Sequence, residues 1–111
     1  NVKQEINNLN SKNKNKIIEI ETLDKFNNLD ELASLISNLD LVITVSNINT
    51  NFASSLGIET WGIARDNNEH FFYSTKRTKN CDWHDKLKIF YIKNNLNPTL
   101  SEIIKRLRNK F

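Results

Sequence analysis

The feature that most constrains the fold is the run LVITV at residues 41–45, in which every residue is apolar or β-branched. A strand with one face in water alternates apolar and polar residues, whereas this run offers an apolar surface on both faces. Such runs are typical of parallel sheets, because helices cover both faces of the sheet. We therefore expect residues 41–45 to form the central strand of an α/β sheet.

Strand-like and helix-like segments alternate around this run. Short β-branched and aromatic runs predict the other strands, at residues 17–20, 60–63 and 86–92. Apolar residues at helical spacing predict helices, at residues 27–40, 49–56 and 97–111. This alternation predicts a Rossmann-like parallel sheet of about four strands with helices on both faces, in the α/β class.

Local signals indicate where the helices begin and end. Asn28 is a plausible N-cap for the first of them, and Gly57 suits the left-handed position that ends the second. Thr99 and Glu102 have capping-box spacing at the start of the third. Residues 1–16 carry a weaker helical pattern, and we expect them to form a weakly ordered leading helix.

Composition limits the number of domains and the environment. A chain of 111 residues with 38% hydrophobic content has room for one domain, so residues 1–111 are expected to form a single, partial Rossmann-like domain. One cysteine excludes a disulfide framework within the chain, and no apolar stretch approaches the roughly 20 residues that cross a bilayer. We therefore expect a cytoplasmic protein without a membrane span. Because residue 1 is not Met, we expect this to be the end of a longer chain.

The candidate site follows the LVITV run directly. In open parallel sheets, ligands bind beyond the carboxyl ends of the strands, and a helix N-terminus there offers unpaired N–H groups to phosphate oxygens. Ser and Asn are also common helix caps, so a phosphate site and a plain cap both remain open. The residues that we expect to bind substrate are Ser46, Asn47, Thr50, Asn51 and Arg65.

The order of these segments resembles a known family. The stretch NNLDELASLISNLDLVITVSN, followed by FASSLGIETW and WHDKLKIFYI, is similar to the C-terminal domain of GT-B-fold glycosyltransferases of the heptosyltransferase-like group, especially members associated with tetratricopeptide repeats. The resemblance covers about residues 17–111. It implies that this part of the enzyme holds a nucleotide-diphosphate-sugar donor, with Ser46 and Asn47 matching the pair that contacts the diphosphate.

The resemblance also implies partners. A GT-B transferase needs an upstream acceptor-binding domain, in the same chain or in a partner, so this chain is not expected to be active alone, and no catalytic residue is assigned. Two strands of the family's sheet, between residues 17–20 and 41–45, have no counterpart here. An upstream segment supplies them, or the two runs pair directly, or the chain forms a homo-oligomer through the open sheet edge.

Other readings compete with donor binding. The chain has Asn51 where the family usually has His, and Ser54 and Ser55 where a Gly is usual, which favours a non-catalytic interaction domain of the same fold as the alternative. The basic segment at residues 74–80 is more typical of a solvated surface than of a nucleic-acid site, and the net charge of +3 is mild.

A metal centre is also a weak candidate. Cys81, Asp82 and His84 stand close together, and His70 is the other soft donor nearby. A structural zinc site wants four ligands at recognisable spacing, which this cluster does not show. We therefore expect no metal and no cofactor.

Overall fold

The computed structural model describes residues 1–20, 27–65 and 84–111. In these parts of the chain it contains four helices and three strands. Their order is α1 (Val2–Lys12), α2 (Leu29–Ser37), β1 (Val42–Val45), α3 (Ile48–Ser55), β2 (Thr60–Arg65), β3 (Leu87–Ile92) and α4 (Asn97–Lys110).

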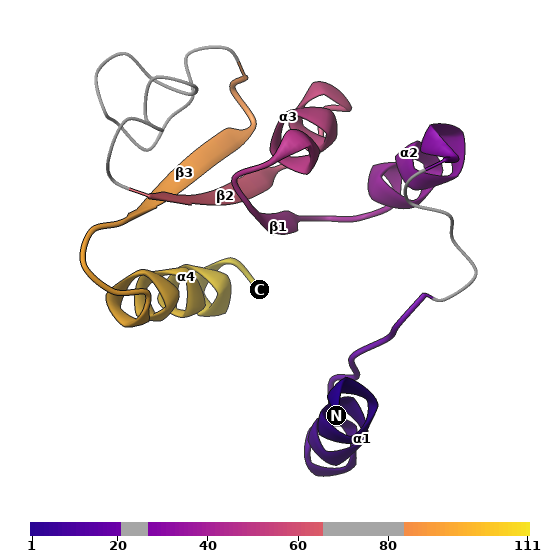
Figure 1. The fold of residues 1–111 in the computed structure, drawn as a ribbon, viewed down its shortest axis with the longest axis vertical. Helices are drawn as coiled ribbons and strands as arrows, with labels where there is room; N and C mark the ends of the chain where they lie inside the picture. The colour runs from indigo at the N-terminus through magenta and orange to yellow at the C-terminus, as the bar shows by residue number, and fades with distance from the viewer. Residues whose placement is uncertain (21–26, 66–83) are drawn as a thin grey trace.

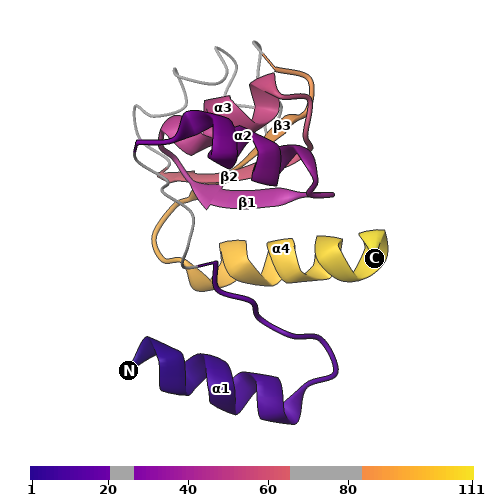
Figure 2. The ribbon, with the colours of Figure 1, turned by 90° about the vertical axis from the view of Figure 1, so that its right-hand side faces the viewer.

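The three strands form one parallel sheet in the order β1-β2-β3 (Figure 1). Helices α2 and α3 lie over one face of the sheet, and α4 lies along the other (Figure 2). The expected α/β class, with a parallel sheet and helices on both faces, is therefore confirmed. All three strands run in the same direction, so their carboxyl ends meet at one edge of the sheet.

The position of β1 differs from the expectation. Among the described strands β2 is central and β1 lies at the edge, where Ile43 is 42% exposed and Val45 is 61% exposed. The α4-facing side of β1 is left partly open because α4 packs below β2 and β3, against Trp61 and Phe90. β1 thus has the apolar sequence of an interior strand, although it lies at the edge of the described sheet.

Residues 17–20 do not form the expected fourth strand. The Asn10 side chain accepts a hydrogen bond of 2.6 Å from the Ile17 amide and donates one of 2.9 Å to the Ile17 carbonyl. These two bonds occupy the amide and the carbonyl of Ile17, which would otherwise be open to a neighbouring strand. Direct pairing of residues 17–20 with β1 is therefore not found, and the described sheet has three strands instead of four.

The core has one layer on each face of the sheet. On the α3 face, Ala64, Leu87 and Ile89 pack together. On the α4 face, the Trp61 and Phe90 rings lie 5.5 Å apart between centroids and pack with residues of α4. These two layers hold α3 and α4 against the strands, and so fix the loops at the carboxyl edge.

Two of the three expected helix ends are confirmed. Asn28 caps α2 by accepting a hydrogen bond of 3.0 Å from the Glu31 amide, and Gly57 after α3 has a φ of 81°. The capping box at Thr99 and Glu102 is wrong, because α4 begins at Asn97 and Thr99 is buried. The Thr99 hydroxyl instead donates to the Tyr91 carbonyl, 3.2 Å away, which ties α4 to β3.

The leading helix is shorter than residues 1–16, since α1 ends at Lys12, and it buries no residue. Among the described residues, no helix is both long enough and apolar enough to cross a membrane.

Candidate functional site

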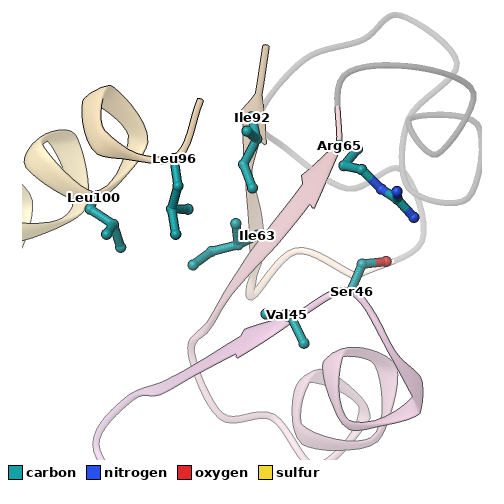
Figure 3. A pocket seen from close by; sticks show the side chains of 7 residues that line it. All are labelled: Val45, Ser46, Ile63, Arg65, Ile92, Leu96 and Leu100. Carbon is teal, nitrogen blue, oxygen red and sulfur yellow. The ribbon is translucent and has the colours of Figure 1, made fainter. Parts of the chain in front are cut away.

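The candidate site is a pocket of about 380 Å³ at the carboxyl edge of the sheet, on the α4 side. Its walls come from the ends of all three strands and from the start of α4 (Figure 3). The lining residues are Val45, Ser46, Ile63, Arg65, Ile92, Leu96 and Leu100. Ligands of open parallel sheets bind at this position, beyond the strand ends.

Two of the expected site residues meet at the rim of this pocket. Ser46 follows β1 and Arg65 ends β2, and the parallel register that pairs Val45 with Ile63 sets the two side by side. The Ser46 amide donates a hydrogen bond of 2.8 Å to the Ile63 carbonyl, which fixes the loop at this point. Figure 3 shows the Ser46 hydroxyl and the Arg65 guanidinium on the same side of the pocket, away from α4.

Asn47 and Thr50 are engaged in holding the start of α3. The Asn47 side-chain oxygen accepts a hydrogen bond of 2.8 Å from the Asn49 amide. The Thr50 hydroxyl accepts one of 3.3 Å from the Asn47 amide and donates one of 3.1 Å to the Val45 carbonyl. Thr50 is fully buried, so its side chain lies inside the fold.

This capping leaves few free donors at the start of α3. The Ile48 amide donates no hydrogen bond to any described residue, as is usual for the first residue of a helix. A phosphate oxygen would meet the Ile48 amide directly, and it would compete with the Asn47 oxygen for the Asn49 amide. The helix start can thus offer the Ile48 amide to an anion, but it can offer the Asn49 amide only by displacing part of its own cap.

Asn51 lies apart from the other expected site residues. It is exposed on α3 and does not line the pocket, and its carbonyl accepts a hydrogen bond from the buried Ser54 hydroxyl. The structure therefore brings Ser46 and Arg65 together at the pocket, and it leaves Asn47, Thr50 and Asn51 outside the described lining.

Sequence reasoning missed the apolar wall of the pocket. Leu100 is one of the apolar residues at helical spacing that predict the last helix, yet it is 37% exposed, and Leu96 is 42% exposed. The signal was present in the chain: Leu96 and Leu100 stand four residues apart just after β3, so both lie near the carboxyl edge.

Metal ligation is not supported in the described part of the chain, which holds no group of three or more His, Cys, Asp or Glu residues suited to an ion. His84 is half-buried there, and its carbonyl accepts a hydrogen bond from the Leu87 amide. Cys81, Asp82, His70 and the basic segment at residues 74–80 lie outside the described residues.

Comparison with known proteins found no matching family model, no matching curated protein and no matching solved structure. The fold and the pocket are therefore the observations from which a function is argued.

Proposed function

We propose that this chain is the donor-binding portion of a GT-B-type glycosyltransferase, with the diphosphate of a nucleotide sugar at the loop of residues 46–51. The observation that supports the proposal is the position of Ser46 and Arg65 on the same side of the pocket rim. An arginine guanidinium presents a planar set of donors that matches phosphate oxygens, and a serine hydroxyl adds a neutral donor. The Ile48 amide at the start of α3 adds a backbone donor beside them.

The proposal is tested by titrating the whole protein with UDP and GDP while its backbone amide signals are followed by NMR. We expect the amides of residues 46–52 to shift. Arg65→Gln should weaken binding about tenfold, because a hydrogen bond to a charged group contributes roughly 1.5–3 kcal/mol. Arg108→Gln is the matched control, since Arg108 is exposed in the last turn of α4, outside the pocket.

Absence of any shift at millimolar nucleotide would contradict donor binding. Equal weakening by Arg65→Gln and Arg108→Gln would instead indicate that the nucleotide responds only to the net positive charge of the protein.

The self-capped start of α3 favours a second candidate, a non-catalytic interaction domain of the same fold. Asn47 and Thr50 already use the hydrogen-bonding groups that a diphosphate would need. Transfer or hydrolysis of any nucleotide sugar by the full-length protein would refute this candidate.

A further inference from the structure

We infer that the pocket at the carboxyl edge binds an amphipathic anion, that is, an aliphatic chain that carries a phosphate or carboxylate group at one end. A nucleotide sugar contains no aliphatic chain, so this ligand class goes beyond the proposed donor. The inference shares only the polar rim, Ser46 and Arg65, with the proposed function.

The wall of the pocket is aliphatic. Five aliphatic lining residues come from the three strands, from the turn before α4 and from α4 itself, and Figure 3 shows their side chains around one space. They are Val45, Ile63, Ile92, Leu96 and Leu100. Because several of these side chains are more than a third exposed, a ligand that covers them removes apolar surface from water.

The size and composition of the pocket suit a small organic molecule. Its volume of about 380 Å³ falls within the usual range for such sites, roughly 300–1,000 Å³. Such pockets are mostly apolar with a few polar groups that orient the ligand. The described lining contains no aromatic ring and no amide side chain, which are common partners of a nucleotide base.

The polar end of the pocket selects an anion. Arg65 brings a guanidinium group, which carries a positive charge and several N–H donors, and the adjacent Ser46 adds a hydroxyl. None of the described lining residues is acidic, so none of them repels a negative charge. In Figure 3 both polar groups lie on one side and Leu96 and Leu100 on the other, which sets the direction of the ligand: head group at the strand ends, chain toward α4.

Calorimetric titration of the whole protein with decyl phosphate, decanoate and decanol tests the inference. We expect both anions to bind at least tenfold more tightly than decanol. The anion that binds more tightly shows whether the site prefers a phosphate or a carboxylate head group. Shortening decyl phosphate toward butyl phosphate should weaken binding by roughly two- to fourfold for each methylene removed, as expected for partial to full burial of each group.

Two variants of α4 form a matched pair. Leu100→Asp places a charge in the aliphatic wall and should weaken decyl phosphate binding at least tenfold. Ile104→Asp makes the same kind of change one turn further along α4, at a residue that is 49% exposed and does not line the pocket, and it should leave binding unchanged. Arg65→Gln should weaken decyl phosphate binding and leave decanol binding unchanged. Circular dichroism shows whether each variant is folded. If Leu100→Asp does not fold, Leu96→Asn is used for the same test.

Three results would overturn the inference: affinity that does not change with chain length, equal effects of Leu100→Asp and Ile104→Asp, or a dimer that Leu100→Asp dissociates, since a second copy would then fill the pocket. The two proposals can fail separately. If the protein binds UDP and does not bind decyl phosphate, only the inference of an amphipathic ligand is refuted. If it binds decyl phosphate and does not bind UDP, only the proposed nucleotide donor is refuted.

Discussion

The Thr50 hydroxyl donates a hydrogen bond of 3.1 Å to the Val45 carbonyl and thereby joins the start of α3 to the end of β1. The same hydroxyl accepts from the Asn47 amide, so one buried side chain holds both sides of the loop between them. Ser46 lies inside this closed loop, and the Thr50 contacts therefore position one of the two polar groups at the pocket rim.

Replacing Thr50 by valine keeps the volume but removes both hydrogen bonds. The Val45 carbonyl and the Asn47 amide each lose the partner of a part-buried hydrogen bond, which costs up to about 1–3 kcal/mol. We expect Thr50→Val to lower the free energy of unfolding by this amount in urea denaturation, whereas Thr50→Ser, which keeps the hydroxyl, should lose less. A Thr50→Val protein as stable as the parent would show that the hydroxyl does not hold the loop.

Gly62 lets α3 approach the sheet closely. A Cβ at this position would lie 2.9 Å from Cδ1 of Ile89 and 3.0 Å from Cγ2 of Thr50. Both neighbours are fully buried, so neither side chain has free space to move into. Overpacking of this kind costs about 1–3 kcal/mol, and we expect Gly62→Ala to destabilise the protein accordingly.

The double variant Gly62→Ala with Ile89→Val separates crowding from other causes. Ile89→Val removes the Cδ1 methyl, so the pair should be less destabilised than the sum of the two single variants. Strict additivity in urea denaturation would contradict crowding between position 62 of β2 and Ile89 of β3.

The start of α2 and the end of α3 could be predicted because their signals are local. Gly57 ends α3 with a positive φ, and Asn28 caps α2, since each depends on the backbone of its own turn. The parallel sheet followed from the spacing of strands and helices along the chain. Ser46 and Arg65 met as expected because carboxyl ends of parallel strands share one edge.

The features that could not be predicted depend on contacts between distant or competing groups. LVITV is apolar on both faces wherever it lies in the sheet, so its sequence does not distinguish a central strand from the edge position of β1. Residues 17–20 have a strand-like composition, but the amide and the carbonyl of Ile17 are hydrogen-bonded to the Asn10 side chain. Thr99 has cap-like spacing but reaches the Tyr91 carbonyl across the β3–α4 turn.

An ion pair at the amino end of β2, opposite the pocket, makes a pH-dependent contribution to stability. Lys110 Nζ lies 2.6 Å from Oε2 of Glu59, and this hydrogen bond is the largest cause that holds the pKa of Glu59 below its ordinary value of 4.5. A carboxylate with a lowered folded-state pKa stabilises the protein above its unfolded pKa, and this contribution is lost as the pH falls through the folded value.

We therefore expect Glu59→Gln to be less stable than the parent at neutral pH, by no more than about 1 kcal/mol because both side chains are partly exposed. The difference should vanish well below pH 4.5, and Lys110→Gln should show the same trend. Urea denaturation across this pH range measures both variants. A difference that stays constant with pH would exclude the ion pair as its source.

The outer edge of β1 predicts association between chains. The Val42 and Ser46 amides point toward β2, where they donate to the Glu59 and Ile63 carbonyls, so the amides of the alternate residues in β1 point away from the sheet. The strand carries no charge and no proline, the usual protections of an exposed edge. We expect the sedimentation coefficient of the protein to rise with concentration.

Ile43→Lys tests whether β1 is the surface involved. A lysine at this half-exposed position can extend its ammonium group to water, so the variant should fold, but its charge opposes edge-to-edge pairing and should keep the chain monomeric. Ile18→Lys is the matched control, because it makes the same change at an exposed residue outside the sheet and should leave association unaltered. If both variants reduce association equally, general surface hydrophobicity rather than the β1 edge brings the chains together.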